Sequence, residues 1–270
     1  MASRTTGTLP VSTVTVDAAA AGLDAVALKP TECDTRRALD VPVPTVVVDY
    51  EGPGSLPDTD ALRRLAAEKR TRVTTPVRAD GFDPLGDDAV DGDLPASVGR
   101  VLVAGNPAYL TEAERERAVA PRLRAARDRW PDAWVGTEGI ERVALAVGGT
   151  QYELLSRTTR RDVAALRAAG FDGTIAVYAP TLFVDDDDAV LDAVGSYVAR
   201  RRPVARALPD GAPTDADAEG RAREVLLAAA RDHALVGTPD AVGRQVADLR
   251  EAGVDRVVGY PARGLGRLLD

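Results

Sequence analysis

The sequence has 270 residues and a mass of 28.4 kDa, and 45% of its residues are hydrophobic. This is enough apolar material for one large domain or two ordinary ones. A single cysteine, Cys33, excludes a disulfide scaffold, and no apolar run approaches the ~20 residues that cross a bilayer. The first residues lack the apolar stretch of a secretory signal, so we expect a cytoplasmic protein with a free thiol.

The net charge is −8 and the sequence pI is near 4.9, which disfavours nucleic acid as a partner. Only Lys29 and Lys69 among the 34 basic residues are lysines, and aspartate outnumbers glutamate. This balance is typical of proteins from high-salt cytoplasms and predicts a salt-adapted, haloarchaeal-like source. The acidic runs show no calcium-loop spacing, so we predict no metal site.

In chain order, one pattern appears three times: a glycine, an apolar residue and an aspartate, followed by a short apolar run. The copies begin at Gly22, Gly170 and Gly253. Glycine supplies the left-handed conformation that ends a helix, and the apolar run suits a strand buried on both faces. Each copy therefore predicts a helix that leads into a strand, and the proline after each run is expected to end that strand.

Further apolar runs fill the intervals between these copies. We expect eight strands at residues 14–16, 25–28, 45–50, 72–77, 100–105, 134–147, 175–179 and 256–260, the sixth including the run 143–147. We expect helices at residues 61–69, 112–130, 159–169, 189–199, 219–233 and 239–252. Strands that alternate with helices along the whole chain favour a single (β/α)₈ TIM-type barrel over residues 1–270, with irregular acidic loops at 80–97 and 203–218. An open doubly wound sheet is the alternative, but no Gly-x-Gly-x-x-Gly turn follows the first strand.

In such a barrel the functional residues follow the carboxyl ends of the strands. Lys29 holds such a position and is a candidate Schiff-base nucleophile, or else a lysine ion-paired with Asp49 or Glu51. Glu138 and Tyr260 also follow predicted strands and are the other catalytic candidates.

The segment Gly148-Gly149-Thr150 closes the apolar run 143–147 and is expected to precede a helix. Two glycines allow backbone amides to approach an anion, so this turn is the best candidate for a phosphate site, although a plain turn fits as well. The one histidine, His233, is expected near a helix end as a cation or as core filler. We expect Lys29, Glu138, Gly148 and Tyr260 to share one rim of the barrel.

The second half of the chain resembles the luciferase-like superfamily of flavin- or deazaflavin (F420)-dependent oxidoreductases. The resemblance is carried by residues 235–242 (LVGTPDAV), 249–258 (LREAGVDRVV), 144–150 (ALAVGGT) and 175–180 (IAVYAP). It implies a barrel that binds F420 or FMN, hydride transfer as the chemistry, and a cofactor-phosphate turn at Gly148, Gly149 and Thr150.

Two other functions stay open. One is a non-catalytic barrel that binds a ligand or serves as a scaffold, and the other is a lyase or aldolase that uses Lys29. In all three cases we expect a small-molecule ligand and no membrane partner, and the sequence leaves a homo-oligomer open.

Overall fold

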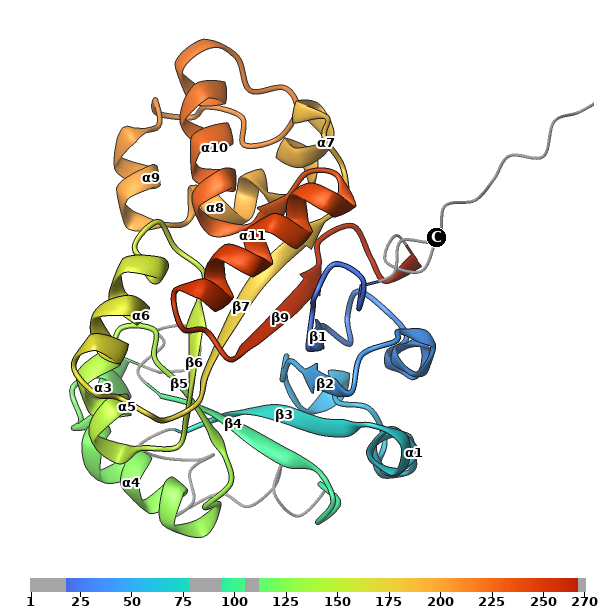
Figure 1. The fold of residues 1–270 in the computed structure, drawn as a ribbon, viewed down its shortest axis with the longest axis vertical. Coiled ribbons are helices and arrows are strands. Elements are labelled where there is room, and N and C mark those ends of the chain that lie inside the picture. The colour runs from blue at the N-terminus through green and yellow to red at the C-terminus, as the bar shows by residue number, and fades with distance from the viewer. Residues whose placement is uncertain (1–17, 78–93, 105–111, 267–270) are drawn as a thin grey trace, which may run out of the picture.

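The computed structural model describes residues 18–77, 94–104 and 112–266 (Figure 1). The predicted strand at residues 14–16 lies outside this part of the chain, as does most of the predicted loop 80–97.

Eight parallel strands form a closed ring. They are β1 (Ala25–Leu28), β2 (Thr45–Val48), β3 (Arg70–Pro76), β4 (Gly99–Val103), β5 (Trp134–Gly136), β6 (Thr150–Leu154), β7 (Ile175–Leu182) and β9 (Arg256–Pro261). Neighbours pair in sequence order, and the ring closes because β9 pairs with both β7 and β1. A short ninth strand, β8 (Leu235–Val236), pairs only with the end of β7. The predicted (β/α)₈ barrel is confirmed, and the open sheet is wrong.

Helices surround the ring (Figure 1). They are α1 (Thr59–Glu68), α3 (Glu112–Arg115), α4 (Val119–Arg129), α5 (Glu141–Val147), α6 (Thr159–Ala168), α10 (Gly220–His233) and α11 (Pro239–Glu251), with 3₁₀ turns at Thr35–Asp40 and Pro53–Ser55. Between β7 and α10 lie α7 (Asp187–Val190), a π-helical stretch (Leu191–Gly195), α8 (Ser196–Ala199) and α9 (Arg202–Ala207). We call residues 183–234 the helical insert. In the described part of the chain, no helix has the length and apolarity that a membrane crossing demands.

Side chains along each strand point alternately into the barrel interior and toward the helical layer, because successive residues of a β-strand face opposite sides of the sheet. On β2, Val47 packs inside the barrel, whereas Val46 and Val48 pack outward against helices. On β6, Tyr152 points inward, so Glu153 points outward. The interior holds Trp134, Tyr152 and Tyr178 among small residues, so aromatic rings fill one side of the barrel.

The aspartates of the repeated pattern tie the strands together at their amino ends. The Asp24 carboxylate accepts a hydrogen bond from the Val257 amide at 2.7 Å, and Asp255 accepts one from the Ile175 amide at 2.7 Å. In the first copy the aspartate therefore joins β1 to its neighbour β9, and in the third copy it joins β9 to its neighbour β7. The glycine of the third copy, Gly253, has a φ of +108°, as a glycine-ended helix requires.

Arg167 of α6 holds this end of the barrel. Its guanidinium donates to the carbonyls of Gly253 (2.8 and 3.0 Å), Phe171 (2.9 Å) and Gly173 (2.7 Å) and pairs with Asp255 at 2.6 Å. We expect Arg167→Ala to lower the free energy of unfolding by about 2 kcal/mol, because several carbonyls lose a charged donor.

Chemical denaturation measures this loss. The control is Arg161→Ala on the same helix, whose side chain is 77% exposed and pairs only with the adjacent Asp162. It should change stability by no more than about 0.5 kcal/mol. Equal effects of the two substitutions would show that the Arg167 contacts add nothing to stability.

One predicted strand is a helix. Residues 143–147 belong to α5, and the strand comes afterwards, as β6. A five-residue apolar run fits a buried strand and a packed helix equally well, so its periodicity could not decide. In the structure only Ala144 of this helix is buried, which is the one-sided burial of a surface helix.

Three further boundaries differ from expectation. The predicted irregular segment 203–218 begins inside a helix, α9, which has Pro203 in its first turn, where proline is tolerated. The helix expected at 112–130 is divided into α3 and α4, whereas the one expected at 189–199 is helical throughout but contains the π-helical stretch. Pro180 does not end β7, because β6 stops opposite Tyr178 and Pro180 is paired on the β9 side alone.

Candidate functional site

A cavity of about 580 Å³ lies at the carboxyl ends of the strands, and we call it the mouth cavity. Each strand from β1 to β7, or the segment directly after it, contributes at least one lining residue, and the helical insert supplies three more. The lining residues are Lys29, Asp49, Glu51, Thr74, Val103, Ala104, Gly136, Thr137, Glu138, Tyr152, Leu154, Tyr178, Tyr197, Arg200 and Arg201. This is the end of a (β/α)₈ barrel where ligands bind.

Lys29 is held at the rim by two partners. Its ammonium lies 2.9 Å from a carboxylate oxygen of Glu32 and 3.2 Å from the hydroxyl of Tyr260, with the Tyr260 ring centre 4.5 Å away. The Tyr260 hydroxyl donates to the other oxygen of Glu32. Burial, together with Glu32, raises the pKa of Tyr260, so its phenol stays protonated. Two predicted candidates, Lys29 and Tyr260, therefore lie in contact.

Asp49 comes directly after β2. Because it lies two residues after Val47, its side chain points to the inside of the barrel, as that of Val47 does. Burial of its carboxyl group raises the pKa of Asp49 to about 7, with Glu51 and Glu32 adding to the effect and Lys29 opposing it. Among the described residues, none donates a hydrogen bond to this carboxylate. A carboxyl group that titrates near neutrality inside a cavity is suited to accept or to release a proton.

Aromatic rings form one wall of the mouth cavity. Tyr178 stacks on Tyr260, with ring centres 6.1 Å apart and an interplanar angle of 18°, and meets Tyr152 edge-on at 6.1 Å. Trp134 packs on Tyr152, with ring centres 5.7 Å apart, and like Tyr260 it supports the wall without itself lining the cavity. Burial holds the pKa of Tyr178 well above its usual range. The wall therefore presents neutral, flat surfaces to a ligand.

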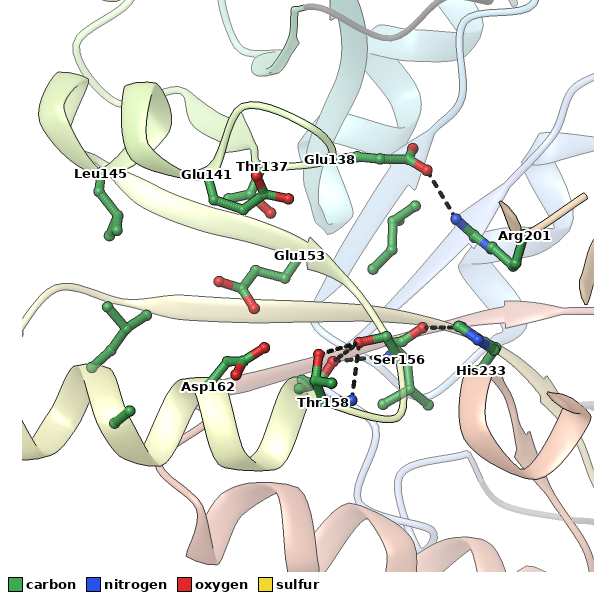
Figure 2. A pocket seen from close by; sticks show the side chains of 15 residues that line it. Thr137, Glu138, Glu141, Leu145, Glu153, Ser156, Thr158, Asp162, Arg201 and His233 are labelled. Atoms are coloured by element: carbon green, nitrogen blue, oxygen red, sulfur yellow. Dashed lines mark hydrogen bonds and ion pairs between the residues drawn. The ribbon is translucent and has the colours of Figure 1, made fainter. Parts of the chain in front are cut away.

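Arg201 connects the helical insert to the barrel. Its guanidinium pairs with Glu138 at 2.8 Å (Figure 2). It also donates a hydrogen bond to the Tyr197 hydroxyl and lies 4.5 Å from the centre of the Tyr197 ring. The predicted candidate Glu138 thus lies at the mouth, as expected, but as the partner of an arginine. Arg200 also lines the cavity and adds a second positive charge from the insert.

The Gly148-Gly149-Thr150 turn lies elsewhere. It leaves the end of α5 and enters the amino end of β6, so a helix precedes it and a strand follows it, the reverse of the predicted order. Parallel strands place their amino and carboxyl ends on opposite faces of the barrel. Of the four residues expected to share a rim, Lys29, Glu138 and Tyr260 do so, and Gly148 does not.

His233 ends α10, as predicted, and its Nδ1 lies 3.2 Å from the Leu155 carbonyl oxygen. Burial lowers the pKa of His233, so the neutral ring, rather than a cation, is the dominant form near neutral pH. The described residues include no group of three His, Cys, Asp or Glu side chains placed to hold a metal ion.

Sequence reasoning undervalued Asp49 and overlooked Arg201 as a site residue. Asp49 could have been found, because the alternation Val47, Asp49 places it on the inner face of β2. Arg201 carried no such signal, since its place depends on how the helical insert folds over the barrel.

The closed parallel barrel and its surrounding helices define a (β/α)₈ protein. The chain belongs to a family of unknown function (DUF7388), whose sequence profile matches residues 18–268. No curated protein matches the sequence.

Two solved structures are similar in fold. One is the coenzyme F420-dependent tetrahydromethanopterin reductase from Methanopyrus kandleri, with a TM-score of 0.55 and 14% identity over 91% of this chain and 96% of that one. The other is an F420-dependent secondary alcohol dehydrogenase in complex with an F420–acetone adduct, with a TM-score of 0.58 and 12% identity over the same shares. At these identities the likeness establishes the barrel fold alone.

Proposed function

We propose that this chain is an F420-dependent oxidoreductase whose cofactor binds in the mouth cavity. The observation that carries the proposal is the mouth cavity itself, which joins an aromatic wall, two arginines and a carboxyl group of near-neutral pKa. The fold likeness to two F420-dependent enzymes supports the choice of F420 over FMN.

The lining residues suit such a cofactor. A volume of about 580 Å³ lies within the range of about 300–1,000 Å³ that is common for small-molecule sites. Tyr178 and Tyr152 offer apolar faces to a flat ring, and Arg200 and Arg201 offer positive charge to a phosphate-bearing tail. We leave the Gly148-Gly149 turn out of this site because it lies at the other end of β6.

F420 supplies a hydride donor or acceptor when it is bound. The reduction of a carbonyl group also needs a proton, and the reverse reaction needs a base. Asp49 fits both needs, since its pKa of about 7 leaves it part protonated and part ionised near neutral pH. Lys29 and Tyr260 flank it as positively charged and neutral donors. In this proposal the aromatic wall also excludes water from one side of the cavity.

The geometry does not favour a Lys29 lyase. A Schiff-base nucleophile must reach a carbonyl carbon with its nitrogen, but the Lys29 nitrogen is already bound by Glu32 at 2.9 Å and lies 4.5 Å from the centre of the Tyr260 ring.

Equilibrium binding of F420, followed by its absorbance and fluorescence, tests the proposal. We expect saturable binding that Arg201→Ala weakens by about tenfold, because one charged contact to an anionic cofactor is lost. The control is Arg206→Ala on α9, an exposed arginine outside the mouth cavity, which should bind as the wild type does.

Failure of the folded wild-type protein to bind F420 would refute the proposal. Tight binding of FMN with no affinity for F420 would replace F420 by a flavin. Binding of F420 with no reduction of any carbonyl substrate would favour the non-catalytic ligand-binding barrel.

A further inference from the structure

A second cavity of about 540 Å³ lies beside the mouth, and we call it the side cavity (Figure 2). Helices α5 and α6 form its two long walls, and β6 forms its floor. It shares Thr137, Glu138, Leu154 and Arg201 with the mouth cavity, so the Glu138–Arg201 ion pair stands between the two spaces. The helical layer of a barrel is normally packed at this place, so an open space of ligand size is unusual.

The floor of the side cavity carries a carboxylate where an apolar residue is expected. Glu153 occupies an outward position of β6, and its register partner on β7 is Val177, which is fully buried. Glu153 has no hydrogen-bond or ion-pair partner among the described residues. Figure 2 shows its side chain in the open space between the two helices.

The two charged groups that act most on Glu153 are both carboxylates. Glu141 of α5 and Asp162 of α6 face the same space (Figure 2). Burial raises the pKa of Glu153, and Asp162 and Glu141 raise it further. Asp162 is paired with Arg161, which is exposed, and Arg201 directs its guanidinium to Glu138. His233 is predominantly neutral near neutral pH, so no described cation that lines the cavity forms an ion pair with Glu153.

The apolar part of the lining comes from both helices and from the end of β6. It consists of Leu145, Leu154, Leu155, Ala165 and Leu166. A ligand that satisfies both parts of the lining needs a positive charge at one end and an apolar chain at the other. A metal ion meets only the need for positive charge, because it has no apolar part, and the described acids do not group as metal ligands.

We propose that the side cavity binds an organic cation, an alkylammonium group whose nitrogen lies at Glu153 and whose chain lies along Leu145 and Leu166. The ammonium forms a charge-assisted hydrogen bond to the Glu153 carboxylate, and the chain removes apolar surface from water. Because the site shares a wall with the mouth, the bound cation lies next to the proposed cofactor site, but it does not depend on that cofactor.

Calorimetric titration of the full-length protein without cofactor tests this inference, with three probes of equal chain length: hexylammonium, hexanol and hexanoate. We expect hexylammonium to bind at a single site, hexanol to bind at least about tenfold more weakly, and hexanoate to give no binding heat. Glu153→Gln keeps the size of the side chain and should weaken hexylammonium binding by at least about tenfold. Glu68→Gln, on the exposed end of α1, should leave the binding unchanged.

Three results would overturn the inference: no hexylammonium binding by the folded wild-type protein, equal affinity for hexylammonium and hexanol, or unchanged affinity in Glu153→Gln. Circular dichroism of each variant shows whether it is folded. If Glu153→Gln is unfolded, Glu153→Asp replaces it, which keeps the charge but withdraws it by one methylene; it should weaken hexylammonium binding relative to the wild type, and an unchanged affinity would overturn the inference. These results are separate from F420 binding, which can fail while the side cavity still takes the ammonium probe.

Discussion

Asp49→Asn should make the protein more stable than the wild type at pH 8. At pH 4 most of this difference in stability should disappear. The folded-state pKa of Asp49 is about 7, whereas its ordinary value is 3.8. Below pH 4 the carboxyl group is protonated in both the folded and the unfolded state, so its contribution to stability is fully present. As the pH rises from about 4 to about 7, the unfolded state loses this proton first, and the contribution is lost.

The size of the effect follows from the same shift. A rise of about three pKa units corresponds to at most about 4 kcal/mol in the free energy of unfolding, and less where water reaches the carboxyl group. Asparagine does not ionise and so escapes this cost. Urea denaturation at pH 4, 6 and 8 measures the difference between the two proteins.

The matched control is Asp60→Asn, because Asp60 is an exposed carboxylate on α1 that pairs with Arg63. It should follow the wild type at every pH. If the stabilities of Asp49→Asn and the wild type stay parallel from pH 4 to pH 8, Asp49 does not titrate near neutrality, and its proposed role as proton donor or acceptor fails.

Gly195→Ala should be the most damaging single-methyl substitution in the helical insert. Gly195 ends the π-helical stretch, and a Cβ atom there would lie 2.0 Å from the carbonyl oxygen of Thr214. The obstacle is backbone and cannot rotate away, so the segment around Thr214 must shift. We expect a loss of about 3 kcal/mol in the free energy of unfolding.

Hydrogen exchange locates this damage. Amides of α8 and α10 should exchange faster in Gly195→Ala, and F420 binding should weaken, since Tyr197 and Arg201 belong to the same insert. The control is Gly243→Ala in α11, where an added Cβ meets no atom within 4 Å. It should raise stability by about 0.5–1 kcal/mol, because alanine favours a helix. Equal stability of the two variants would mean that Gly195 does not pack closely against the Thr214 carbonyl group.

The barrel could be predicted because its strands are short apolar runs that alternate with helices, and three of them follow the same glycine-containing pattern. The aspartate of that pattern is visible in the sequence, but its partner is not. The Asp24 carboxylate accepts a hydrogen bond from the amide of Val257, which lies 233 residues away along the chain. Only the closed ring of strands brings the two residues together. The prediction of a strand at 143–147 was wrong because an apolar run of five residues is too short for its periodicity to distinguish a helix from a strand.

The site could be predicted only where it follows strand ends. Lys29, Glu138 and Tyr260 were placed correctly at the rim by that rule. The rule misplaced Gly148 because the run before the turn was taken for a strand. In the structure that run is the helix α5, and the strand β6 follows the turn. The pKa of Asp49 and the contacts of Arg201 depend on burial and on the fold of the insert, which local spacing does not contain.

A crystal structure of the protein in complex with F420 would show most directly where the ligand lies. We expect the ring of the cofactor between the tyrosine wall and Asp49, with its phosphate group near Arg200 and Arg201. A cofactor bound at the Gly148-Gly149 turn, or on the outer surface of the barrel away from Asp49, would contradict a functional site at the mouth.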